Sequence, residues 1–270
     1  MNTTTIALPF RRNIPSIGFF TSSRRAIFLF HFVFLLMAWV FSSSKIIPTP
    51  TEVWLAFVNL WNQGFALDLW TSFWLNVQAL AISSAISTSL VYLSASPVVG
   101  KHVRPYITAV SKFRFMGMVG WSLAFTLMFG GGHYLKISLM VFAMTGFMTT
   151  AMASVVAGIP KESYDHARTL RMGEWRIVWE VVILDTLPGI VDVIIQNAAI
   201  GWTILAMVEG LSRSEGGVGV LLLSQNKFFR LDAIAAIQLS ILCLALLQDS
   251  FLRLGHKSIF SYAYLEKENS

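Results

Sequence analysis

Residues 134–157 read YLKISLMVFAMTGFMTTAMASVVA, with Lys136 as the one charged side chain. A helix rises about 1.5 Å per residue, so about 20 apolar residues cross the roughly 30 Å hydrocarbon layer of a bilayer. This run is long enough to cross, and it ends in the turn residues Gly158 and Pro160. It therefore predicts a membrane-spanning helix and an all-α polytopic fold.

The composition of the chain supports that prediction. The 270 residues are 55% hydrophobic and 13% charged, with a mean hydropathy of +0.65, whereas soluble domains carry about 25% charged residues. An ordinary water-soluble enzyme is excluded. The single cysteine, Cys243, excludes an internal disulfide and a cysteine-cluster metal site. The net charge is +6, but the lysines and arginines are scattered between apolar runs and form no basic stretch, so they indicate no nucleic-acid partner.

Five further apolar runs bring the number of expected transmembrane helices to six. The third run is short, and we expect residues 106–110 to extend its helix across Lys112 and Arg114. The first follows four arginines without a small-residue cleavage pattern behind it, which is typical of an uncleaved signal anchor. The five runs cover residues 24–44, 69–94, 115–129, 187–208 and 233–252.

The basic residues orient these helices. With the amino terminus in the cytoplasm, 15 of the 20 lysines and arginines fall on the cytoplasmic side, which satisfies the positive-inside rule. We expect cytoplasmic tails at residues 1–25 and 256–270, and one transmembrane domain over residues 26–255. Both termini then face the cytoplasm of a bacterial inner membrane.

Motifs for catalysis are missing from the sequence. No phosphate-binding glycine loop, metal-spaced histidine pair, nucleophile elbow or dinucleotide fingerprint occurs. The glycines at 130–132 lack the lysine and hydroxyl of a phosphate cradle and predict a periplasmic turn. We expect no catalytic residue, no metal site and no cofactor.

The longest cytoplasmic loop, residues 158–186, predicts a two-helix elbow. Pro160 suits the start of a short helix, Gly173 suits its end, and a second helix follows on the membrane surface until Pro188 turns the chain into the fifth span. Ala167 between Asp165 and Arg168 is small enough to fit a groove on a partner, which could move the helix as a lever.

Polar residues within two spans form stripes. Asp192, Gln196 and Thr203 share one helix face, and a carboxylate inside lipid is costly enough to suggest a function. Alternatively, Asp192 is solvated or paired with an arginine near the cytoplasmic surface. Asn76 heads a second stripe, whose serines suit close helix packing better than substrate contact. These serines are Ser83, Ser87 and Ser94.

Several motifs over residues 45–254 resemble the permease subunits of binding-protein-dependent ABC importers of the nitrate, sulfonate and taurine type. An IPTPTEV opening stands at residues 47–53, where Thr51 suits a helix cap. The stretch IPKESYDHARTLR at 159–171 resembles the cytoplasmic signature of that family, and VVILDTLP at 181–188 resembles the family's run into span five. Glu209 and the GGVG at 216–219 resemble the end of span five and the following loop in members of that family.

The resemblance implies a type I importer domain that forms a dimer around a central pathway. A separate ATPase subunit would consume the ATP, and a periplasmic or lipid-anchored solute-binding protein would deliver a small anion or organic solute. The pathway candidates are Asn76, Asp192, Gln196 and Thr203. The candidate ATPase contacts are Tyr164, Asp165, His166, Ala167, Arg168, Thr169, Leu170, Arg171 and Gly173.

The chain departs from the family pattern at Asp165, His166, Arg171 and Leu184. An altered signature is compatible with one unequal subunit of a heterodimer or with an ATPase whose groove is altered to match. Two alternatives from other classes stay open. One is a proton-coupled secondary transporter with Asp192 as proton carrier, and the other is a membrane subunit that transports nothing.

Overall fold

The computed structural model describes residues 27, 29–31, 33–34, 37, 39–40, 47–212 and 216–261, in two units that divide after Glu52. The described residues between 27 and 40 are helical, and the Trp39 indole donates a hydrogen bond to the Pro48 carbonyl (2.9 Å). Most of the first expected span lies outside the described residues, as do both ends of the chain.

The helix α2 (Pro50–Asn62) starts with a reciprocal cap. The Thr49 amide donates to the Glu52 carboxylate (2.7 Å), and the Glu52 amide donates to the Thr49 hydroxyl (3.4 Å). This is a capping box. The cap is therefore Thr49 and not Thr51, because Pro50 lacks an N–H and fits the first helical position.

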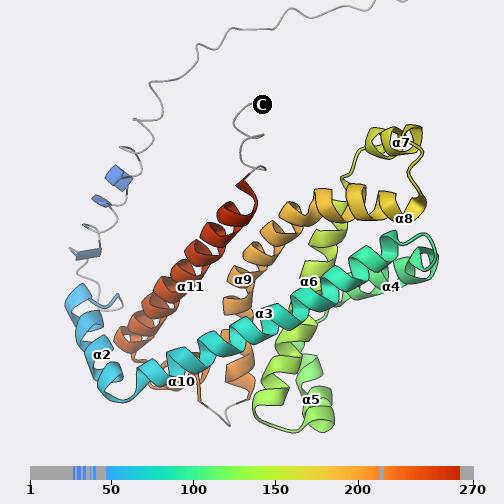
Figure 1. Cartoon of the computed structure of the whole chain (residues 1–270). Coiled ribbons are helices and arrows are strands. Elements are labelled where there is room, and N and C mark those ends of the chain that lie inside the picture. Colours follow the sequence, from blue (N-terminus) through green and yellow to red (C-terminus); the bar gives the residue numbers. More distant parts are fainter. Residues whose placement is uncertain are drawn as a thin grey trace, which may run out of the picture. The chain divides into compact units, whose positions relative to one another are not determined.

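The regular elements in the described part of the second unit are all helices, without a strand, as expected (Figure 1). Two short segments depart from α geometry, the 3-10 turn η1 (Phe113–Phe115) and the π-helix η2 (Val178–Leu184). The other elements are α3 (Phe65–Ala95), α4 (Gly100–Lys112), α5 (Met118–Phe129), α6 (His133–Ala157), α7 (Lys161–Thr169), α8 (Glu174–Ile177), α9 (Asp185–Leu211), α10 (Val218–Lys227) and α11 (Leu231–Ile259).

The core of this unit is α6, which packs against both α3 and α9. Its buried face carries a methionine at every fourth position, and all four side chains are fully buried: Met140, Met144, Met148 and Met152. Methionine is unbranched and adapts to irregular gaps between helices. In lipid such packing is favoured by dispersion contacts, since apolar side chains gain little by leaving hydrocarbon.

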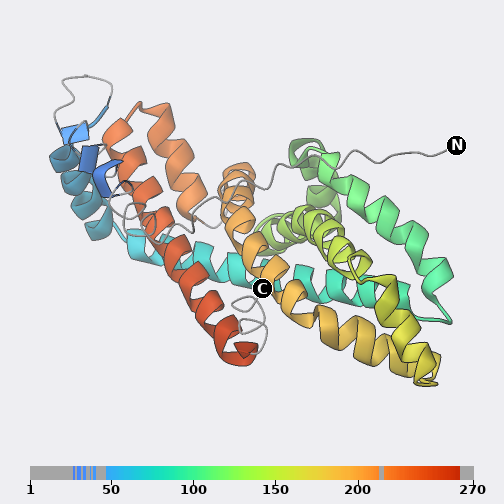
Figure 2. The ribbon, with the colours of Figure 1, turned by 90° about the horizontal axis from the view of Figure 1, so that it is seen from above.

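Three helices of the described part are long and apolar enough to cross a membrane by length and composition, namely α3, α6 and α11. They match the second, fourth and sixth expected spans. The fifth span corresponds to α9, a helix of 27 residues. On the side of α9 away from α6, α10 and α11 pack on each other and on α9 (Figure 2).

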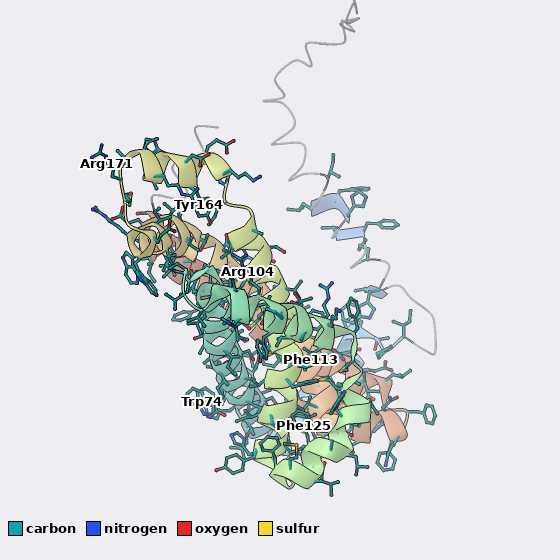
Figure 3. The ribbon with its side chains drawn as sticks, turned by 90° about the vertical axis from the view of Figure 1, so that its right-hand side faces the viewer. Trp74, Arg104, Phe113, Phe125, Tyr164 and Arg171 are labelled. Atoms are coloured by element: carbon teal, nitrogen blue, oxygen red, sulfur yellow. The ribbon has the colours of Figure 1, made fainter. Side chains whose placement is uncertain are left out.

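The third span differs from the prediction. One helix does not run through Lys112 and Arg114. Instead α4 ends at Lys112, and η1 and an extended backbone at Gly117 separate it from the 12-residue α5. Aromatic packing explains the break, because Phe113 of η1 and Phe125 of α5 (both labelled in Figure 3) lie against Phe142 of α6, with ring centroids 5.4 and 5.3 Å away.

The elbow after α6 also differs from the prediction. The short helix ends at Thr169, and Arg171, not Gly173, closes the turn that follows it. Arg171 has a left-handed backbone (φ 56°), and the amides of Arg171 and Met172 donate to the carbonyls of Arg168 and Ala167. This is a Schellman motif with arginine at the position where glycine is usual. Gly173 instead precedes α8 as its N-cap.

Pro188 does not turn the chain between two helices. The helical path is continuous from α8 through η2 into α9, and Pro188 lies inside α9. A proline removes one backbone donor and crowds the carbonyl four residues earlier, here Leu184, the last residue of η2. The π-helical turn in front of Pro188 absorbs this defect and leaves the helix unbroken.

A substitution at Gly146 tests the close contact between α6 and the break in the third span. A Cβ atom at Gly146 would lie 3.0 Å from the backbone nitrogen of Arg114. We expect Gly146→Ala to destabilise the protein by about 1–3 kcal/mol, the usual cost of overpacking. Thermal unfolding in detergent, followed by tryptophan fluorescence, measures the effect.

Gly120→Ala is the matched control, because Gly120 also lies in a helix but a Cβ there meets nothing within 4 Å. Alanine at this site should leave stability unchanged or raise it through helix propensity. Equal effects of the two substitutions would contradict the close approach at Gly146.

Candidate functional site

The helix α7 is a short polar helix between α6 and α8 (Figure 1). Asp165, His166 and Thr169 are exposed along it, whereas Ala167 is 3% exposed and lies against the chain itself. Ala167 is therefore not offered to a partner in this arrangement. The exposed surface of the signature consists of its polar residues and the adjacent Leu170, whose side chain is exposed.

The remaining residues of the signature lie on both sides of α7. Tyr164 is half-buried, and this burial raises the pKa of its hydroxyl above the ordinary value, so the group stays a protonated donor near neutral pH. Arg168 is exposed and lies 3.8 Å from the Asp165 carboxylate, an exposed pair that contributes little to stability. Arg171 and Gly173 are exposed in the turn that follows.

Asp192 has a partner that the sequence analysis did not name. Its carboxylate lies 3.7 Å from Nδ1 of His256 on α11, with the histidine buried and the Asp192 side chain 42% exposed. Nε2 of the same ring lies 3.2 Å from the Pro188 carbonyl. The contact joins α9 to α11 through a histidine and not through an arginine.

The polar stripe on α9 is present, but Asn76 is not part of it. Gln196 and Thr203 are exposed on the same face of α9 as Asp192. Asn76 is fully buried on α3 and lies against Gly201, on the opposite face of α9.

The amide of Asn76 belongs to a buried polar contact between helices. Its nitrogen donates to Oε1 of Gln248 (3.3 Å), which also accepts a hydrogen bond from the Trp202 indole (2.8 Å). Asn76 therefore links α3 to α11 inside the bundle. Of the four residues predicted to line a pathway, three lie together on an exposed face and the fourth lies in the packed interior.

The serines of α3 pack helices together, as the sequence suggested. Ser83 and Ser87 are fully buried. The Thr149 hydroxyl of α6 donates to Ser87 Oγ (3.1 Å), and Ser83 Oγ donates to the Ala79 carbonyl of its own helix. Small hydroxyl side chains allow two helices to approach closely in lipid.

A buried acidic cluster, which the sequence analysis did not single out as a site, lies where α9 ends. Glu209 is fully buried. The Ser72 hydroxyl donates to its Oε1 (2.6 Å) and the Gly219 amide to its Oε2 (2.8 Å). Ser72 Oγ in turn accepts a hydrogen bond from the Val218 amide (3.0 Å).

Two further charged residues complete this Glu209 cluster. The Gly217 amide donates to Asp68 of α3 (2.9 Å), and the buried ammonium of Lys136 donates to the Gly216 carbonyl (2.9 Å). The cluster thus ties the segment before α10 to α3, α6 and α9. The sequence motif that marks this cluster is Glu209 followed by GGVG at residues 216–219. The structure explains the glycine at 217, because a Cβ atom there would clash with the Glu209 carboxylate.

No group of three or more histidine, cysteine, aspartate or glutamate side chains among the described residues is placed to hold a metal ion. The chemistry of these sites is that of hydrogen bonding and charge, with α7 exposed near one end of α9 and the Glu209 cluster at the other. An exposed polar helix of this kind can bind a partner and be displaced by it. Among these residues, no side chain is placed as an activated nucleophile.

Comparison with known proteins shows the fold. No protein-family model matches the sequence, and no curated protein matches it. Among solved structures, a chain of the inward-facing MetNI methionine ABC transporter aligns with a TM-score of 0.57 at 16% identity, over 72% of this chain and 93% of that one. A chain of an amino acid ABC transporter with histidines aligns with a TM-score of 0.55 at 14% identity, over 75% and 98%. The fold of this chain is therefore similar to that of ABC transporter chains.

The Glu209 cluster generates a stability prediction. Glu209→Ala removes the acceptor for Ser72 and Gly219 and takes away one of the two carboxylates, Glu209 and Asp68, that share the cluster with the buried Lys136 ammonium. We expect a loss of about 3–5 kcal/mol, the usual cost of removing one member of a buried charged contact. Glu209→Gln keeps an acceptor oxygen and should cost less, as measured by unfolding in detergent.

Ser72→Ala should cost about 1–3 kcal/mol, because it leaves buried groups without their hydrogen bonds. Ser84→Ala on the same helix is the control, since the Ser84 hydroxyl is not buried and donates within its own helix to the Ala81 carbonyl. If Ser72→Ala were as mild as Ser84→Ala, the cluster would not be a stabilising contact.

Proposed function

We propose that this chain is the transmembrane permease subunit of an ABC importer. The observation that carries the proposal is the exposed helix α7, which joins the spanning helix α6 to the helical path that leads into α9, within a fold similar to that of two ABC transporter chains. The sequence contains no nucleotide-binding motif, so a separate ATPase subunit would hydrolyse ATP.

The coupling that we propose is mechanical. The Schellman turn at Arg171 joins α7 to α8, and the helix is continuous from Glu174 to Leu211. A helix of this length spans roughly 57 Å. An ATPase that displaces α7 would therefore move this whole segment, including the polar stripe near its centre and Glu209 at its end.

The remaining parts of the assembly follow from the same proposal. Gln196 and Thr203 are exposed on one face of α9, and the Asp192 side chain on the same face is 42% exposed. Such a face in a membrane turns toward water or protein. A second permease subunit would cover it and enclose the pathway, and a periplasmic or lipid-anchored binding protein would deliver solute. The chain would lie in the bacterial inner membrane with both termini in the cytoplasm.

The break in the third span favours an anionic solute. The Arg114 backbone lies against Gly146, near the middle of α6, and Lys112 and Arg114 are exposed there. Cations at that level of a spanning helix are costly unless they face water or a counter-charge. We propose that they attract a small anion of the nitrate, sulfonate or taurine class.

The contact between Asp192 and His256 favours a second candidate. Two titratable groups 3.7 Å apart at the end of a spanning helix suit a proton-coupled transporter. Asp192→Asn separates the two functions. Uptake by proteoliposomes that contain no ATPase, abolished by Asp192→Asn, would support proton coupling. Uptake that requires ATP in the assembled complex would support the importer.

A crosslinking experiment tests the coupling surface. In a Cys243→Ser background, single cysteines at Asp165, His166 and Thr169 should crosslink to the ATPase subunit of the purified complex, because these positions are exposed on α7. The yield should change when ATP is replaced by a non-hydrolysable analogue.

Ala167→Cys is the matched control, since this position is 3% exposed on the same helix. It should crosslink far less than its exposed neighbours. Absence of crosslinks from all three exposed positions, in a complex that hydrolyses ATP, would count against the proposal.

The solute prediction is tested with Arg114→Gln and Lys112→Gln. Removal of one attractive charge should lower ATP-dependent anion uptake by about tenfold, since a pathway of low dielectric strengthens each charge. Lys227→Gln, an exposed lysine at the end of α10, is the control. Equal uptake by all three variants would exclude a role for the two cations in anion selection.

A further inference from the structure

A cavity of about 520 Å³ lies between the ends of α3 and α6, the start of α4 and the helices α7 and α8. Tyr164 and Arg168 of α7 line it, whereas the residues of the polar stripe on α9 do not. Its volume is in the range of sites that bind small organic molecules. Arg104 and Tyr164, both on its wall, are labelled in Figure 3.

The charged groups on its wall are mainly cationic. Lys101 and Arg104 come from the first turns of α4, and Arg168 comes from α7, whereas Glu174 is the one acidic residue among them. None of the ion pairs between described residues involves Lys101 or Arg104. Arg168 lies 3.8 Å from the Asp165 carboxylate, so the positive charge on the wall that is in no ion pair is that of Lys101 and Arg104.

A buried hydroxyl on this wall has no partner. Ser96 is 9% exposed and lines the cavity, and its Oγ makes no hydrogen bond among the described residues. The backbone of Ser96 is satisfied, because its amide donates to Leu93 and its carbonyl accepts from Gly100. A buried hydroxyl without a partner is unusual and costs about 1–3 kcal/mol. A bound acceptor would remove that cost.

Most of the rest of the wall is apolar. Val91 of α3, Val156 of α6 and Val182 of η2 line it, together with other small apolar side chains. The hydroxyl of Tyr164, which stays protonated near neutral pH, adds a second neutral donor on the same wall. The cavity thus combines hydroxyl donors, guanidinium and ammonium groups, and an apolar surface.

We propose that this cavity binds a phosphate group carried on an apolar body. Its oxygens would accept hydrogen bonds from Ser96 and Tyr164 and pair with Lys101, Arg104 and Arg168, since guanidinium groups match phosphate geometry. The apolar body would lie along the valines. Two sources share this chemistry, an anionic phospholipid and a soluble organic phosphate. The occupant would join α7 to the turn between α3 and α4.

The test uses the purified full chain in nanodiscs and needs neither ATP nor transport, so its outcome is independent of the proposed function. The lipid arm compares phosphatidylcholine with and without phosphatidylglycerol and counts retained phosphatidylglycerol by native mass spectrometry. The soluble arm titrates hexyl phosphate, with hexanol as its uncharged counterpart, into phosphatidylcholine nanodiscs by calorimetry.

The double variant Lys101→Gln/Arg104→Gln should weaken binding in the responsive arm by about tenfold or more, the loss expected for charge-assisted contacts. Ser96→Ala should weaken it by a smaller factor with the fold intact. Lys227→Gln/Lys257→Gln removes two exposed lysines outside the cavity and should leave binding unchanged.

A response confined to phosphatidylglycerol identifies a lipid, and one confined to hexyl phosphate identifies a soluble ligand. A response in both arms means that the phosphate group alone is recognised. Binding in neither arm, or binding that both double variants weaken equally, would overturn the proposal.

Discussion

The packing of α6 between α3 and α9 is the constraint on which the other features depend. Its four buried methionines recur every fourth residue and therefore lie on one side of the helix. In lipid, apolar burial alone contributes little, so the stability of this interface comes from close contact. The same requirement explains Gly146, where the absence of a side chain lets the Arg114 backbone approach α6.

Several polar groups inside this bundle form hydrogen bonds to another helix. Glu209 at one end of α9 is bound by a serine and a backbone amide, and Asn76 shares the Gln248 acceptor with Trp202. An unsatisfied polar group away from water costs several kcal/mol, so each such contact restricts the register of two helices. The polar contacts specify which helix faces meet, and the apolar contacts hold those faces together.

The path from α7 to α9 joins a solvent-exposed helix to the interior of the bundle. The π-helical η2 allows Pro188 to lie inside a continuous helix, which would otherwise bend or break at that point. The cavity beside α7 lies next to the first part of this path, since Glu174, Val178 and Val182 line it. A ligand there and a partner on the exposed face of α7 would act on the same helical segment from two sides.

The sequence by itself determined the helical class, the second, fourth and sixth spans, and the short helix that starts after Pro160, because apolar length and turn residues are local properties. It also placed Asp192, Gln196 and Thr203 on one helix face. Only the tertiary structure decided that Ala167 lies inward, that Asn76 lies apart from that stripe, and that Glu209 meets Ser72, 137 residues away. The break after Lys112 likewise depends on Phe142 of another helix. The period of a helix shows which residues share a face, but the neighbour that covers that face depends on how the helices pack.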